Sequence, residues 1–235
     1  MPAGVPPKDG QAQPRYQEVP AGTLLWRVTG VADGQSPEPE PSLFRSPVRD
    51  MEEDSLRWGG RFDATPDCPY PYCYAAFDDL TALCEVLLRD VPFNSPQRYL
   101  PASAVTGRSL VLLETLRPLR LVSLLAAADL AAARQDTWLV HTDHTNYPVT
   151  RLWAHWLRDG EDTAGQGPPA GLVWPSKRHP SGQAVLLFGD RCGDAVTYSP
   201  FGARPLDDEA GLDWLNRRLS LLRTRVNRPR ARPAA

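Results

Sequence analysis

The chain has 235 residues, with 26 basic and 28 acidic side chains and a formal net charge of −2 at pH 7. This balance provides no general positive field for a nucleic-acid backbone, so direct nucleic-acid binding is not expected. The first residues lack the basic start and apolar run of a secretory signal, and no stretch approaches a membrane-spanning length of apolar residues. The sequence therefore predicts a cytoplasmic protein that does not enter a membrane.

Length and composition predict one folded domain between two tails. Residues 1–20 are rich in Pro, Gln and Gly, a composition typical of a disordered tail, and residues 33–41 resist regular structure for the same reason. Residues 21–226 are expected to form a single domain. Residues 227–235 form a basic C-terminal tail.

The predicted elements follow one another along this domain. In chain order, we expect a strand at Thr23–Thr29, a strand at Tyr72–Phe77, a helix capped by Asp78 and Asp79 and reaching Val91, strands at Ser109–Thr115 and Leu119–Leu124, helices at Leu125–Arg134 and Tyr147–Arg158, strands at Gly171–Trp174, Ala184–Phe188 and Ala195–Tyr198, and a helix at Asp207–Val226. Strands come in groups with helices between them, which favours an α+β fold. No GxGxxG motif follows a strand, which argues against a Rossmann fold.

A glycine pair followed by an arginine, Gly59-Gly60-Arg61, stands out in the first half of the chain. Two glycines let the backbone approach a ligand closely, and a guanidinium can hold a phosphate through two parallel hydrogen bonds. An ordinary turn with a solvated arginine explains the same residues. Arg27 lies within a predicted strand, where a charged side chain needs a reason.

Glu85 and Ser176 each allow a structural and a functional interpretation. Glu85 lies four residues before Arg89, a spacing typical of a weak ion pair on a helix surface. In a cleft, its carboxylate would instead stabilise positive charge developing on a ribose. Ser176 lacks the GxSxG motif and an assignable base, which argues against a nucleophile. As a hydrogen-bond donor to a ligand, however, it needs no activation.

The cluster His141-Thr-Asp-His144 is the one metal-like group of ligands in the sequence. Its spacing matches no HExxH motif, and no metal site is predicted. A metal-dependent hydrolase that uses His141, Asp143 and His144 is accordingly the least favoured hypothesis.

Taken together, several short motifs resemble the RES-domain family, which is named for its arginine, glutamate and serine. The motifs, which keep the family's order between about Leu24 and Arg191, are Trp26-Arg27, Gly59-Gly60-Arg61-Phe62-Asp63, Tyr74-Ala75, Ala82-Leu-Cys-Glu85 and Pro175-Ser176. The chain departs from the common pattern at Trp26, where a tyrosine is frequent, and at Cys68–Cys73, where a glycine usually precedes the tyrosine strand. The resemblance implies a pocket for nicotinamide, and these differences concern the shape of that pocket.

The resemblance implies a fold like that of ADP-ribosyltransferase toxins, with mostly antiparallel strands in two packed sheets and flanking helices. It implies cleavage of NAD as the substrate, with inorganic phosphate as a possible second substrate and no bound cofactor. The implied catalytic residues are Arg27, Glu85 and Ser176, and the implied substrate-binding residues are Gly60, Arg61 and Tyr74. It also implies a toxin whose partner is an antitoxin with a helix-turn-helix DNA-binding domain. Two alternatives stay open: transfer of ADP-ribose to a protein, and a module that binds a nucleotide or a protein without catalysis.

Overall fold

The computed structural model describes residues 4–7, 13–30, 43–44, 59–89, 91–93, 95–160, 165 and 167–228. The expected loop at residues 33–41 and most of the basic tail lie outside these ranges. The strands are β1 (Tyr16–Val19), β2 (Leu24–Gly30), β3 (Tyr72–Ala76), β4 (Arg98–Leu100), β5 (Arg108–Thr115), β6 (Leu119–Ser123), β7 (Gly171–Pro175), β8 (Gln183–Phe188), β9 (Val196–Pro205) and β10 (Thr224–Val226). The helices are α1 (Asp79–Leu87), α2 (Ala127–Ala132), α3 (Trp138–His141), α4 (Tyr147–Arg158), α5 (Gly189–Cys192) and α6 (Glu209–Ser220). No helix within the described ranges is long and apolar enough to span a bilayer.

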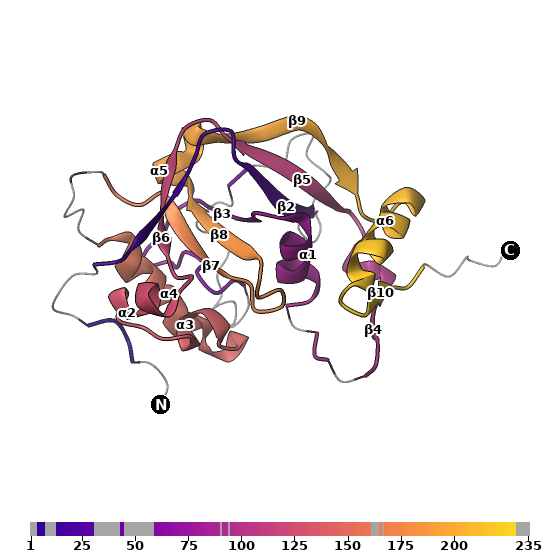
Figure 1. The fold of residues 1–235 in the computed structure, drawn as a ribbon, viewed down its shortest axis with the longest axis horizontal. Helices are drawn as coiled ribbons and strands as arrows, with labels where there is room; N and C mark the ends of the chain where they lie inside the picture. Colours follow the sequence, from indigo (N-terminus) through magenta and orange to yellow (C-terminus); the bar gives the residue numbers. More distant parts are fainter. Residues whose placement is uncertain are drawn as a thin grey trace, which may run out of the picture.

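Eight strands form one curved sheet in the order β1-β6-β7-β8-β3-β2-β5-β9 (Figure 1). All neighbours are antiparallel except β6 and β7, and a crossover through α2, α3 and α4 connects that parallel pair. The α+β class and the mostly antiparallel pairing are therefore confirmed. The expectation of two packed sheets is wrong, because β2 joins β3 through the pair Trp26 and Ala76 and so makes the two halves continuous. The second sheet is small, with β10 parallel to β4.

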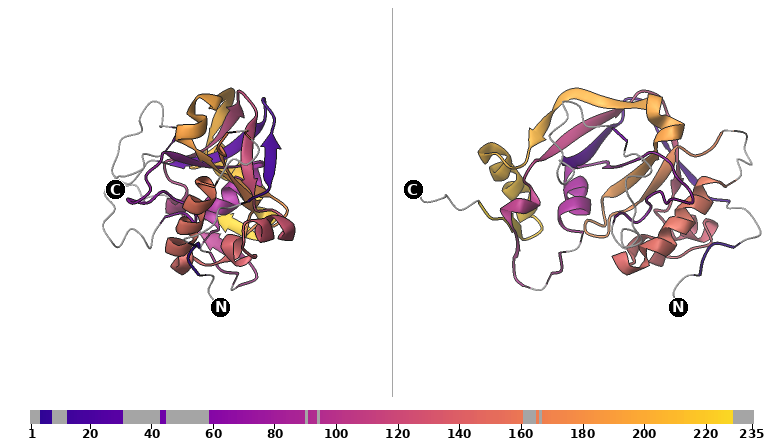
Figure 2. Two further views of the ribbon diagram at one scale, coloured as in Figure 1. Left: turned by 90° about the vertical axis from the view of Figure 1, so that its left-hand side faces the viewer. Right: turned by 180° about the vertical axis from the view of Figure 1, so that it is seen from behind.

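The helices divide between two ends of the molecule. Figures 1 and 2 show α2, α3 and α4 gathered at one end and α6 with β4 and β10 at the other, with α1 between them. The predicted cap of α1 is confirmed at Asp78, whose carboxylate accepts a hydrogen bond from the Thr81 backbone nitrogen at 2.8 Å. This cap fixes where α1 begins, and hence where Glu85 lies.

Several element bounds differ from the prediction: α1 ends at Leu87 rather than Val91, and β9 continues to Pro205 rather than ending at Tyr198. The last helix ends at Ser220 rather than Val226, because Arg223 takes a left-handed φ of 49° and the chain then extends into β10. Thr224 and Val226 alternate with an exposed residue and bury their β-branched side chains beside β4, which is strand behaviour. Near the N-terminus, β1 lies within the residues whose composition suggested a disordered tail, since its pairing with β6 supplies backbone partners there.

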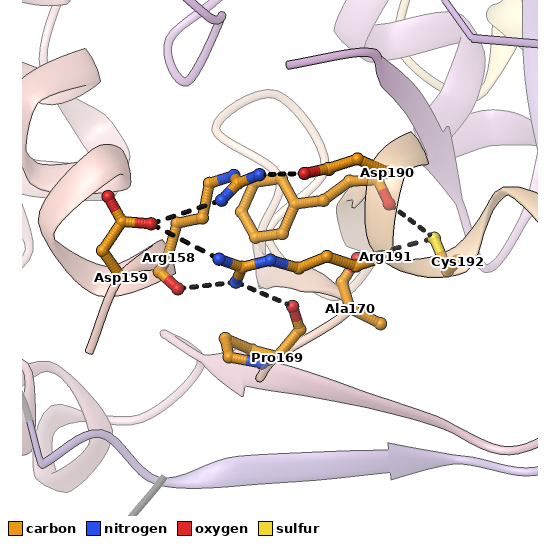
Figure 3. A network of polar contacts seen from close by, with 8 residues as sticks. Arg158, Asp159, Pro169, Ala170, Asp190, Arg191 and Cys192 are labelled. Atoms are coloured by element: carbon orange, nitrogen blue, oxygen red, sulfur yellow. Dashed lines mark hydrogen bonds and ion pairs between the residues drawn. The ribbon is translucent and has the colours of Figure 1, made fainter. Parts of the chain in front are cut away.

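A network of polar contacts fixes the end of α4 to the sheet (Figure 3). Arg158 pairs with Asp159 at 3.2 Å and with Asp190 of α5. Arg191 donates to the Arg158 carbonyl at 2.6 Å, to the Pro169 carbonyl at 3.2 Å and to Asp159 at 3.3 Å. Both guanidinium groups are thus paired with carboxylates. Because α4 also contacts the Gly-Gly-Arg turn, this network holds one wall of the site described next.

Candidate active site

The Arg61 side chain is buried, with 7% of its surface exposed, which excludes a solvated arginine in an ordinary turn. Its guanidinium donates to the carbonyls of Leu139 at 3.3 Å and Thr142 at 3.1 Å. It also lies 5.0 Å from the centre of the Tyr147 ring, within cation–π range. Burial lowers the pKa of Arg61, which the charges of Tyr147 and Glu85 oppose. Arg61 is therefore a buried cation held by two carbonyls, and it lines the same pocket as Glu85.

The turn that carries Arg61, residues 59–61, is clamped by α4. The Arg151 side chain is fully buried and donates through Nε to the Gly60 carbonyl at 3.1 Å. Thr150 donates to the Arg61 carbonyl at 2.5 Å, and the Gly60 nitrogen donates to Asp63 at 2.7 Å. Arg151 is a residue that the sequence argument missed. The sequence does carry a sign of it, because Arg151 lies four residues after Tyr147, on a helix face that is otherwise buried.

Gly60 is required by the packing of the turn itself. A Cβ atom at this position would lie 2.4 Å from Oδ1 of Asp63 and 2.4 Å from the Tyr74 hydroxyl oxygen. Tyr74, from β3, accepts a hydrogen bond from the Phe62 nitrogen at 2.9 Å through that hydroxyl. Burial, together with the Asp63 carboxylate, raises the pKa of Tyr74 well above its ordinary value. Tyr74 thus supports the turn as a neutral phenol.

Glu85 and Ser176 meet across 91 residues of sequence. The Ser176 hydroxyl, from the β7–β8 loop, donates to Oε1 of Glu85 on α1 at 2.6 Å. Ser176 is fully buried, while Glu85 is partly exposed. Arg89, the proposed surface partner of Glu85, donates to the Gly59 carbonyl at 3.1 Å and so reaches the Gly-Gly-Arg turn. A simple surface ion pair therefore does not describe Glu85.

Arg27 lies apart from the other predicted site residues. Its guanidinium donates to the Leu43 carbonyl and approaches the sulfur of Cys73 at 3.2 Å. Successive side chains of a strand point to opposite faces of the sheet, so Cys73 and Tyr74 lie on different faces. The two belong to different core clusters accordingly. The structure thus brings together Gly60, Arg61, Tyr74, Glu85 and Ser176, and places Arg27 on the other face.

A small pocket opens between α1, the start of α4 and the β7–β8 loop. It is lined by Arg61, Glu85, Arg89, Asp143, His144, Tyr147, Lys177 and Arg178. Its free volume is about 20 Å³, close to that of one water molecule. Four of the lining side chains are cationic and two are carboxylates, so the pocket favours an anion. Arg89, Lys177 and Arg178 were not singled out from the sequence, because charges in loops and on helix surfaces are usually solvated.

Lys177 and Asp143 form an ion pair across this pocket, linking the β7–β8 loop to the segment before α4. The hydrogen bond and charge of Lys177 lower the pKa of Asp143. His141 is exposed and its Nδ1 lies 3.2 Å from the Thr137 carbonyl oxygen. Within the described ranges, no three His, Cys, Asp or Glu side chains gather in a way that would hold a metal ion. Asp143 therefore acts as the partner of a lysine here.

Comparisons with known proteins agree with this arrangement of motifs. The family model described as the RES domain matches residues 24–229. Among solved structures, a chain of the M. tuberculosis MbcT–MbcA toxin–antitoxin complex is similar, with a TM-score of 0.48, 15% sequence identity, and coverage of 79% of this chain and 85% of that one. No curated protein matches. Since the family model spans most of the sequence, including every residue of the pocket, this chain belongs to the RES-domain family.

Proposed function

We propose that the chain cleaves the N-glycosidic bond between nicotinamide and ribose in NAD. The observation that carries the proposal is the hydrogen bond between Ser176 and Glu85 at a pocket where four cationic side chains converge. A carboxylate next to a cluster of cations suits a ligand that bears both phosphates and a sugar that becomes positively charged. The resemblance to the RES-domain family implies that this ligand is NAD.

The reaction needs positioning and charge stabilisation more than acid–base chemistry. Nicotinamide leaves as a neutral molecule when the glycosidic electron pair returns to its ring nitrogen, and the ribose acquires oxocarbenium character. The Glu85 carboxylate would stabilise that positive charge, as carboxylates do in glycoside hydrolysis. Ser176, already bonded to Glu85, would hold the carboxylate in place or turn toward a ribose hydroxyl.

The cations of the pocket would hold the pyrophosphate. Arg61, Arg89 and Arg178 come from three separate segments, so they converge only in the folded chain. Arg27 contacts the other face of the sheet in this structure, and the phosphate-binding role therefore rests on the pocket arginines. Tyr74 would contribute by supporting the turn that presents Arg61.

NAD entry requires the pocket to open. Small-molecule sites typically enclose roughly 300–1,000 Å³, far more than the free volume of this pocket. Two walls meet at the Lys177–Asp143 ion pair, which is largely exposed on the aspartate side. Separation of these two loops is the movement that would admit a dinucleotide.

A role in a toxin–antitoxin pair follows from the family resemblance. Under this proposal the chain would deplete NAD, and its partner would be an antitoxin that blocks the pocket and carries a helix-turn-helix domain. Co-expression with the product of a neighbouring reading frame tests the partner, since the antitoxin should both rescue growth and co-purify.

The direct test follows nicotinamide release from NAD by the purified chain. Reactions with and without inorganic phosphate, followed by mass spectrometry of the ribose product, separate hydrolysis from phosphorolysis. Addition of a cell lysate reveals any ADP-ribosylated protein. Tight NAD binding by calorimetry with no nicotinamide released over hours would instead support a binding module.

A further inference from the structure

Glu85 and Ser176 lie on separate segments, and a second set of contacts links those segments. Glu85 lies on α1, and Ser176 begins the loop of residues 176–182 between β7 and β8. Within that loop, the Ser176 nitrogen donates to the Gly182 carbonyl at 2.9 Å, and the Gly182 nitrogen donates to the His179 carbonyl at 2.8 Å. The loop is therefore closed on itself, with His179 at its centre.

His179 contacts both Ser176 and the first turn of α1. Its backbone nitrogen donates to the Ser176 hydroxyl oxygen at 3.2 Å. Its side-chain Nδ1 lies 2.9 Å from the Thr81 hydroxyl oxygen, and Thr81 is fully buried. The Thr81 hydroxyl in turn lies 2.6 Å from Oδ2 of Asp78, the residue that caps α1. One histidine thus ties the serine loop to the helix that carries Glu85.

The direction of these hydrogen bonds follows from their partners. A carboxylate only accepts, so the Thr81 hydroxyl donates to Asp78 and its oxygen must accept from Nδ1–H of His179. Nε2 lies 3.2 Å from the Ser181 hydroxyl, a group that can donate or accept. Because the His179 backbone also donates to Ser176, the Ser176 proton is left to point at Glu85. The network accordingly requires a proton on Nδ1 of His179, which also lies 3.8 Å from Oδ1 of Asp78.

Packing leaves little room for this link to shift. A Cβ atom on Gly182 would lie 1.8 Å from the Thr81 hydroxyl oxygen and 2.7 Å from Nδ1 of His179. Only glycine lets the end of the loop approach α1 so closely. The close approach and the directed hydrogen bonds together fix the loop relative to the helix.

We propose that His179 is a positioning residue that holds Ser176 against Glu85 by tethering the β7–β8 loop to Thr81 of α1. The inference rests on the proposed NAD cleavage for its kinetic consequence. His179 acts through the Ser176–Glu85 pair and touches no substrate itself. Loss of its side chain should therefore lower kcat more than it raises KM.

The kinetic test uses His179→Ala, Thr81→Val, the double variant, and His179→Asn, whose amide can still donate to Thr81. We expect kcat to fall about tenfold to a hundredfold in each of the two single variants. The double variant should be no worse than either single one, because both remove the same link. Partial recovery of kcat in His179→Asn is expected. His141→Ala, at an exposed histidine outside the network, serves as the matched control and should keep wild-type kcat.

A second measurement does not depend on activity. Amide hydrogen exchange should become faster in residues 176–182 in both His179→Ala and Thr81→Val, with no change in β5 and β6. Faster exchange with unchanged kcat would overturn the positioning role, as would unchanged exchange in both variants. If the wild-type protein released no nicotinamide while exchange still responded to both substitutions, the proposed function would fail and the tether would stand.

Discussion

Glu85→Gln is the substitution that most directly tests the proposed chemistry. It removes the negative charge and keeps the shape of the side chain and an oxygen to accept the Ser176 hydrogen bond of 2.6 Å. A carboxylate about 4 Å from a unit positive charge, at an effective dielectric constant of about 20, stabilises that charge by about 4 kcal/mol. About 1.4 kcal/mol corresponds to a tenfold change in rate, so complete loss gives about a thousandfold decrease. The amide dipole of glutamine retains part of this charge stabilisation, and we therefore expect kcat to fall by a hundredfold to a thousandfold.

The assay is continuous measurement of nicotinamide release at saturating NAD, with the melting temperature measured on the same preparation. Glu18→Gln, which makes the same charge change at an exposed position in β1, is the control and should leave kcat unchanged. Because Glu85 is partly exposed and its hydrogen bond is retained, the variant should melt close to the wild-type temperature. A folded Glu85→Gln protein with kcat within threefold of wild type would refute the assignment of Glu85 to charge stabilisation.

Three further outcomes are expected. Gly60→Ala should lose about 1–3 kcal/mol in free energy of unfolding by urea titration, because the new methyl group overlaps the Tyr74 hydroxyl; a loss below about 0.5 kcal/mol would contradict the packing argument. Asp143→Asn should lower KM for NAD at low salt by freeing Lys177 and removing negative charge from an anion pocket, with a smaller gain at high salt. An increase in KM would show that the ion pair aids binding. Burial lowers the pKa of His155 below its ordinary 6.5, so His155 binds a proton at a higher pH in the unfolded chain than in the folded one. The free energy of unfolding should therefore fall as the pH drops below about 6.5, and His155→Gln should reduce this pH dependence; equal dependence in both proteins would exclude His155 as its source.

Much of the fold was predictable because its elements carry strong local signals. The span of α4 was predicted correctly, since a proline near its start and an apolar face define a helix without tertiary information. The end of α6 was not, because a leucine stripe continues past Ser220 while the chain turns at Arg223 to pair with β4. That partner lies more than 100 residues earlier in the sequence. Local periodicity carries no information about such a partner.

The site was predictable in its members and less so in their geometry. The order of short motifs located Arg61 and Glu85, which line one pocket, and Ser176, which donates a hydrogen bond to Glu85. The separation of Arg27 depends on the register between β2 and β3, where Trp26 faces Ala76. This register sets Arg27 on the face of Cys73 rather than that of Tyr74. A shift by one residue would reverse the face, so the sequence pattern alone could not decide it.

The arginines around the pocket and those at the end of α4 differ in what holds them. Arg158 and Arg191 pair with carboxylates, so their charges are neutralised where the sheet meets α4 and α5 (Figure 3). Arg61 instead donates to the carbonyls of Leu139 and Thr142, and Arg178 donates to the carbonyl of Arg89. A carbonyl orients a guanidinium without cancelling its charge. Cations positioned in this way, beside the Glu85 carboxylate that Ser176 holds, would be preorganised for the proposed ligand, an anion whose sugar becomes cationic.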